Sequence, residues 1–132
     1  MAIAIYNAPP GGSKLLPANT AEKVVGIQLN TGNNISFFWT VFGKVVVINP
    51  NAGPVSVQAQ LLLASPATLL DTSFATIPAN GSESISLEGV AVGTAGAPMC
   101  VEIICSTTSL PANAELARLI AISVSPAVTA MC

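Results

Sequence analysis

The chain has 132 residues, of which 52% are hydrophobic and only 8% are charged, and its formal net charge is −2. Charged residues normally make up about a quarter of a globular domain. Four basic residues leave no positive surface for nucleic acid, and no run reaches the roughly 20 apolar residues that cross a bilayer, so we expect neither a nucleic-acid nor a membrane partner.

This composition is typical of a subunit whose surface is covered by copies of itself. A soluble domain with so few charges has little electrostatic repulsion to hold its copies apart, and low net charge promotes association. The first ten residues, MAIAIYNAPP, lack the basic start and the long apolar stretch of a signal peptide. We therefore expect a homo-oligomer whose subunits carry no classical signal peptide.

Residues 1–15 are predicted to form an N-terminal arm. The stretch MAIAIY alternates as a strand does, and its large side chains are those of Ile3, Ile5 and Tyr6. The hinge that follows combines two stiff residues with two flexible ones, namely Pro9, Pro10, Gly11 and Gly12. Such a tethered strand can pair with the open sheet edge of a neighbouring subunit. The alternative is a frayed terminus.

Residues 16–132 are predicted to form a single domain of short strands. Apolar side chains recur with a period close to two in the stretches 23–29, 54–63, 82–92 and 99–107, and 43–49 is an apolar run predicted to be fully buried. Turn-forming clusters separate these stretches, and seven or eight such strands argue for an antiparallel β-sandwich. In 114–119, AELARL, the helix-forming residues allow a brief helical turn before a strand at 119–124.

The tetrapeptide LPAN occurs at 16–19 and 110–113, and IPAN occurs at 77–80. Proline fixes φ and cannot donate to a ladder, and asparagine tolerates the left-handed conformation. Each copy is therefore predicted to be a turn that leads into a strand. The unequal spacing of the copies excludes a solenoid, and the chain lacks the long apolar segment and basic tail of a sorting signal.

Three cysteines occur, at positions 100, 105 and 132. Cys100 and Cys105 share one predicted strand, where five residues separate them by roughly 16 Å, too far for a bridge. Their odd spacing directs Cys105 to the core and Cys100 to the surface. Cys100 and Cys132 are therefore the disulfide candidates, and a bridge within the chain and a link between subunits are both open.

The sequence contains no constellation typical of an enzyme or of a metal site. It has no histidine, which removes the commonest general base and every Ser-His arrangement. The cysteine spacing matches no zinc pattern, and no glycine-rich phosphate loop is present. We expect a non-enzymatic protein without cofactor, metal or small-molecule substrate.

The stretches GNNISFFWTVFGKVVVINPNAGPVSVQ, TIPANGSESISLEG and GTAGAPMCVEIICSTTS, in this order, resemble subunits of the bacterial endospore appendage (Ena) family over residues 20–109. The resemblance implies a jelly roll of about eight strands. It further implies an extracellular fibre on the spore surface, made in the mother cell, in which subunits pair sheet edges and insert N-terminal connectors locked by disulfides.

On that pattern Cys100 is the acceptor cysteine of the fibre. The family's connector carries cysteines and this N-terminus has none, so the resemblance leaves two options: the donor is Cys132, or covalent locking is partial or lost. Two other functions remain as alternatives to the fibre. One is a closed trimeric jelly roll, such as the tip of a spore-surface filament or a phage decoration protein, and the other is a lectin-like adhesin.

Overall fold

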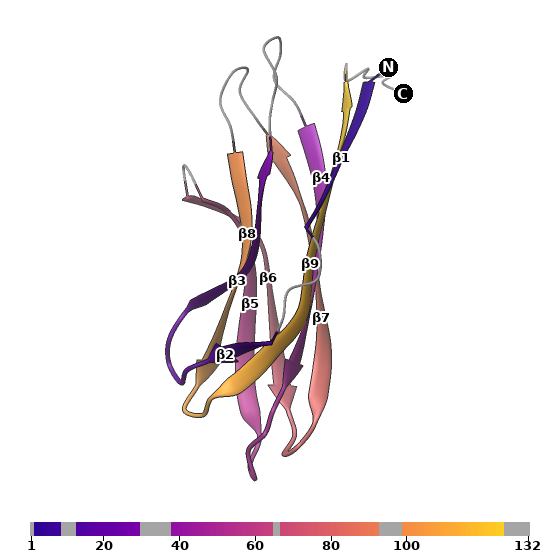
Figure 1. Ribbon diagram of the computed structural model, residues 1–132. Coiled ribbons are helices and arrows are strands. Elements are labelled where there is room, and N and C mark those ends of the chain that lie inside the picture. The colour runs from indigo at the N-terminus through magenta and orange to yellow at the C-terminus, as the bar shows by residue number, and fades with distance from the viewer. Residues whose placement is uncertain (1, 9–12, 30–37, 65–66, 93–98, 126–132) are drawn as a thin grey trace, which may run out of the picture.

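The computed structural model describes residues 2–8, 13–29, 38–64, 67–92 and 99–125, which form two β-sheets packed face to face (Figure 1). These described residues contain nine strands and no helix. The strands are β1 (Ala2–Ala8), β2 (Lys14–Leu16), β3 (Glu22–Leu29), β4 (Phe38–Ile48), β5 (Val55–Ala64), β6 (Ala67–Ile77), β7 (Ser82–Val92), β8 (Met99–Thr108) and β9 (Ala112–Ser125).

The strand order identifies the fold as a jelly roll. One sheet has the order β1-β9-β4-β7, and the other has the order β3-β8-β5-β6. The short strand β2 pairs with the start of β9 while β1 pairs with its end, so the two occupy one position and nine strands fill eight places. This arrangement is the eight-stranded double sheet of a jelly roll. The predicted all-β jelly roll of about eight antiparallel strands is confirmed.

The period-two pattern of the sequence creates the core between the sheets. Along β5, Val55, Val57, Ala59 and Leu61 are buried while the residues between them face outward. Strand β8 beside it has the same alternation. Each fully buried aliphatic side chain stabilises the fold by about 1.5–3 kcal/mol relative to exposure. Two alternating faces packed against each other therefore account for most of the driving force.

The inner face of β4 contains a glycine where the two sheets approach closely. A Cβ added at Gly43 would lie 2.8 Å from Cδ1 of Ile103, which belongs to the opposite sheet. Val41 and Val45 on either side of it are fully buried. The run 43–49 was predicted to be a fully buried strand, but Lys44 is exposed and Val46 is only half-buried. This prediction is corrected, because β4 has one face in the core and one on the outside.

The expected helical turn at 114–119 is wrong, because that stretch lies within β9. The strand runs from Ala112 to Ser125 and contains a β-bulge, since Lys44 faces Arg118 while Val46 faces Glu115. Leu116 adopts φ of 51° there. A bulge accommodates one extra residue by bending the strand, so tertiary pairing with β4 overrides the helical propensity.

Two of the three PAN sequences are left-handed turns. Asn19 has φ of 58° and Asn80 has φ of 57°, and each turn leads into the next strand as predicted. The third copy differs, because Asn113 is paired within β9 with Ile48. At that corner the left-handed residue is Ser109, with φ of 71°.

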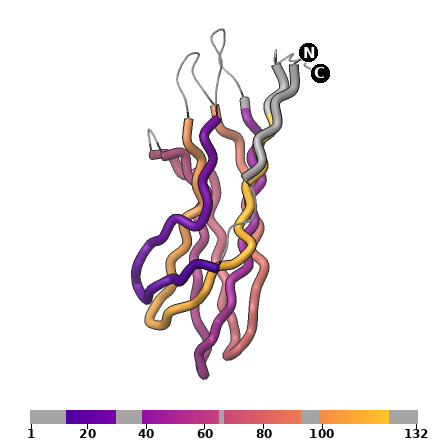
Figure 2. Tube along the Cα trace, viewed as in Figure 1, coloured from indigo at the N-terminus to yellow at the C-terminus, as the bar shows by residue number. Residues whose placement is uncertain are grey.

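The PAN-bearing corners lie at one end of the sandwich (Figure 2) and are joined by asparagine side chains. Asn49 is fully buried and donates through Nδ2 to the carbonyls of Gly53 and Ile77 at 2.8 and 3.0 Å. Asn51 donates through its Nδ2 to the carbonyl of Pro111 at 2.6 Å. Asn19 accepts through Oδ1 from the backbone N–H of Ser109 at 3.2 Å. The repeated tetrapeptide is therefore part of the architecture of this end.

Candidate assembly interface

The N-terminal strand is the edge of the five-stranded sheet. Residues 2–8 pair in antiparallel register with β9, so that Ile3 faces Val124, Ile5 faces Ile122 and Tyr6 faces Ala121. The predicted arm strand thus exists, and in this single chain its partner is the chain's own β9. Pairing with a neighbouring subunit stays a prediction.

The predicted arm and domain meet within an ordered strand. The boundary between residues 15 and 16 falls inside β2, and Leu16 is fully buried. The hinge residues Pro9, Pro10, Gly11 and Gly12 lie outside the described residues. Among the described strands, β1 lies at the edge of the five-stranded sheet and pairs with β9.

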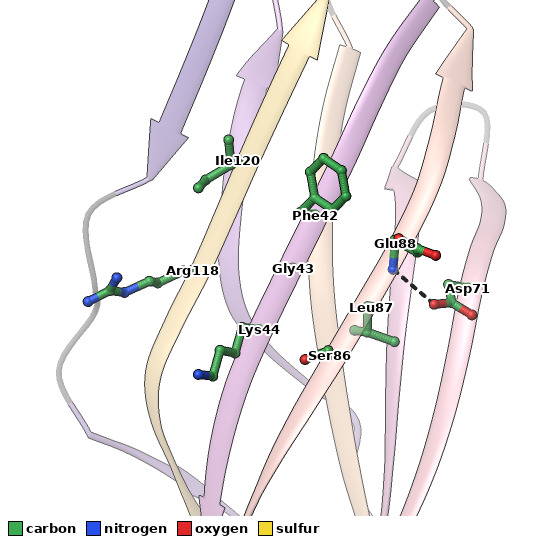
Figure 3. Close-up of a pocket in the computed structure, with 9 residues that line it drawn as sticks. All are labelled: Phe42, Gly43, Lys44, Asp71, Ser86, Leu87, Glu88, Arg118 and Ile120. Atoms are coloured by element: carbon green, nitrogen blue, oxygen red, sulfur yellow. Dashed lines mark hydrogen bonds between the residues drawn. The ribbon is translucent and has the colours of Figure 1, made fainter.

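A groove of about 550 Å³ lies on the outer face of the β1-β9-β4-β7 sheet (Figure 3). Phe42 and Lys44 come from β4, Arg118 and Ile120 come from β9, and Glu88 comes from β7. Asp71 reaches the groove from β6 of the other sheet. Phe42 is 43% exposed and Ile120 is 36% exposed, so the groove has an apolar part and a charged part.

The two cations of this groove stand directly opposite each other. Lys44 and Arg118 are register partners on neighbouring strands, an arrangement that is unfavourable for like charges. The ion pairs found among the described residues use the other two basic side chains, Lys14 with Glu22 at 3.6 Å and Lys23 with Glu102 at 3.4 Å. Lys44 and Arg118 therefore have no anionic partner among the described residues.

Sequence reasoning did not find this groove. In β4, Phe42 and Lys44 alternate with Val41 and Val45. This alternation could have indicated that β4 places Phe42 and Lys44 on the outer face of the sheet. The other members of the groove come from β6, β7 and β9, and their contact depends on the register of strands that are distant in the sequence.

The structure separates the cysteines as the alternation suggested. Cys100 is exposed and faces Gln28 on β3, beside a shallow hollow of about 210 Å³. Cys105 is fully buried, and burial raises the pKa of its thiol to about 12, because an apolar environment disfavours the thiolate. Cys132 lies outside the described residues, so the pairing of Cys100 stays a prediction.

Two further properties concern only the part of the chain that the structure describes. Within those ranges, no cluster of three or more His, Cys, Asp or Glu side chains could hold a metal ion. No helix in the same ranges has the length and apolarity needed to span a membrane.

Comparison with known proteins finds similarity in structure alone. No protein-family model matches the chain, and no curated protein sequence matches it. The structure of the infectious bursal disease virus Gx strain is similar, with a TM-score of 0.55 and 12% identity over 98% of this chain and 35% of the viral one. The VP2 subviral particle of the same virus has a TM-score of 0.51 and 10% identity over 92% of this chain and 33% of the viral one.

The likeness is one of fold. At these identities the viral proteins share the jelly-roll sandwich with this chain, and the chain spans about a third of their length.

Proposed function

We propose that the chain is a structural subunit that assembles with its own copies into an extracellular fibre, through pairing of sheet edges and exchange of β1. The observation that carries this proposal is the attachment of β1. Among the described residues, β1 lies at a sheet edge and pairs through seven residues with β9. A second copy's β1 can make the same seven pairings, so exchange costs little beyond the association itself.

Composition supports the same function. Only 8% of the residues are charged, which leaves little repulsion between copies. The tether 9–12, PPGG, combines stiff and flexible residues as an exchanging arm requires. The VP2 likeness is to a protein that forms a subviral particle, and it supports a role in assembly.

The resemblance to endospore appendage subunits supports the spore surface as the location of the fibre. In this proposal Cys100, which is exposed on β8, links to Cys132 of a neighbouring subunit and strengthens an assembly that β1 already holds. Non-reducing peptide mapping of assembled material would identify the linkage. Peptides joining 100 to 132 between two isotopically distinct copies are expected.

Strand exchange can be tested with a cysteine pair placed across β1 and β9. Ile5→Cys and Ile122→Cys are introduced together in a chain that also carries Cys100→Ser and Cys132→Ser, because residues 5 and 122 are register partners. If β1 is exchanged, oxidation joins one chain to the next and a non-reducing gel shows a ladder. If β1 stays in its own chain, oxidation closes an internal bridge and only monomer is seen, which contradicts the proposal.

Deletion of residues 1–12 distinguishes a fibre from a closed ring. Negative-stain images of the full-length protein are expected to show long polymers, and the deleted chain is expected to show none. A trimeric ring that needs no arm would keep its assembly after the deletion. The matched control is replacement of Ile3 and Ile5 by valine, which retains the strand and should retain the polymers.

A further inference from the structure

We propose that β2 is a fixed anchor: β1 passes to another copy while β2 stays in its own sandwich, held there by Lys14. The anchor rests on the proposed exchange of β1, and it places the end of the exchanged segment before Lys14. The two strands share one partner, because β1 pairs with residues 119–125 of β9 and β2 pairs with residues 112–114. Pairing with β9 therefore does not by itself decide which strand leaves.

The connection that follows β2 has no spare length for exchange. Leu16 is fully buried in the core, while Ala18 forms a β-bridge with Thr107 of β8 and the N–H of Asn19 donates to the carbonyl of Thr107 at 2.9 Å. Pro17 is the one residue between Leu16 and Ala18, and a residue spans at most about 3.6 Å. The proline ring also fixes φ. β2 therefore cannot enter a second copy unless the segment that leads into β3 goes with it.

The connection that precedes β2 is longer. β1 ends at Ala8 and β2 begins at Lys14, and the five residues between them span roughly 17 Å when they are extended. All seven pairings of β1 can be formed again on β9 of another copy. Exchange of an identical element between copies is a low-cost route to assembly. The boundary of the exchanged segment therefore falls between β1 and β2.

Lys14 fastens β2 at the residue where the connection from β1 arrives. Its Nζ donates to the backbone carbonyl of Lys23 at 2.7 Å and lies 3.6 Å from Oε2 of Glu22. Both residues belong to β3, the edge strand of the other sheet, and β2 crosses from β9 toward β3 (Figure 1). Hydrogen bonds from an ionised donor are roughly twice as strong as neutral ones. Lys14 thus ties the first residue of β2 to both sheets.

A second cysteine pair distinguishes exchange of β1 from exchange of β2. Leu15→Cys and Asn113→Cys are introduced together with Cys100→Ser and Cys132→Ser, because residues 15 and 113 are register partners and Leu15 is 60% exposed. If β2 stays in its own sandwich, oxidation of the assembled protein closes a bridge within each chain, and a non-reducing gel shows monomer. Leu15→Cys alone in the same background measures chance linkage between copies.

The pair at 5 and 122 is oxidised in parallel, and we expect a ladder from that pair with bridged monomer from the pair at 15 and 113. Ladders from both pairs would show that β2 travels with β1, which overturns the anchor and leaves the exchange of β1 intact. Monomer from the pair at 5 and 122 would show that β1 is not exchanged, which overturns both proposals. A monomer that keeps free thiols at 15 and 113 would show that β2 leaves β9, and it also overturns the anchor.

Hydrogen exchange measures the contribution of Lys14. Lys14→Met removes the donor and the charge but keeps an unbranched side chain, and the amides of residues 14–16 should exchange at least about tenfold faster. The matched control is Lys23→Met, which loses the ion pair with Glu102 at 3.4 Å but keeps the backbone carbonyl that Lys14 binds. Equal exchange of residues 14–16 in the two variants would show that Lys14 does not hold β2.

Discussion

The carboxylate of Asp71 accepts a hydrogen bond from the backbone N–H of Glu88 at 2.9 Å, and this bond joins an edge strand of one sheet to an edge strand of the other (Figure 3). A bulge makes the approach possible, because Leu61 faces Asp71 while Leu62 faces Leu69 and leaves Leu70 extra in β6. Leu70 then packs against Gly89, and a Cβ added to Gly89 would lie 2.9 Å from the Cβ of Leu70. The Asp71 carboxylate and Gly89 thus allow the two edge strands to approach closely on this side of the sandwich.

Asp71→Ala is expected to lower the free energy of unfolding by about 1–2 kcal/mol, because the charge-assisted hydrogen bond from the N–H of Glu88 is lost. The released edge of β7 should also increase aggregation. Urea unfolding followed by circular dichroism measures the first effect and light scattering the second. The control is Glu83→Ala, which removes a carboxylate on β7 that accepts no such hydrogen bond among the described residues. If the two variants unfold at the same urea concentration, the Asp71 bond does not hold the edges together.

The repeated tetrapeptide offers a matched pair of substitutions. Asn80→Ala should cost about 1 kcal/mol, because alanine resists the left-handed conformation that this position adopts, and Asn80→Gly should be nearly neutral. Asn113→Ala, at the same place in the third copy, should cost less, since Asn113 has the extended backbone of a strand. Thermal unfolding of the three variants tests the order. Equal losses at positions 80 and 113 would contradict the difference in backbone conformation.

Gly43→Ala is expected to destabilise the fold by about 1–3 kcal/mol, as overpacking does in a close-packed core. The new methyl group meets Cδ1 of Ile103 at 2.8 Å. Ile103→Val removes that atom and alone should cost about 0.5–1.5 kcal/mol. The double variant should therefore be more stable than the sum of the two losses predicts. A double-mutant cycle from urea midpoints measures the coupling, and an additive result would show that the two groups do not meet.

The buried thiol predicts a specific loss of stability at alkaline pH. Burial raises the pKa of Cys105 from 9.0 to about 12 in the folded chain, so the folded state retains a proton that the unfolded state releases. The resulting stabilisation is complete below pH 9 and is lost as the pH rises from 9 through 12, by up to about 1.4 kcal/mol per pH unit. Cys105→Ala lacks this contribution. Its unfolding free energy should fall less steeply above pH 9 than that of the unaltered chain, and parallel curves would contradict the assignment.

Much of the fold follows from the sequence because its strands carry a simple pattern. Alternation along 54–63 and 99–107 correctly distinguished the buried face from the exposed one, including buried Cys105 and exposed Cys100. The prediction at 114–119 was wrong because local propensity favoured a helix while pairing with β4 imposed a bulge. The third PAN was likewise placed in a strand by its neighbours, with Ser109 taking the left-handed conformation instead.

The sequence by itself determined the fold class, the faces of the strands with alternating side chains and two of the left-handed turns, because these depend on side chains close together in the chain. Only the tertiary structure decided the partner of β1, the bulge at Leu116 and the groove that Asp71, Lys44 and Arg118 line together. These features arise from the register between strands that are tens of residues apart. A shift of one residue would turn each of their side chains to the other face, and no local pattern records that choice.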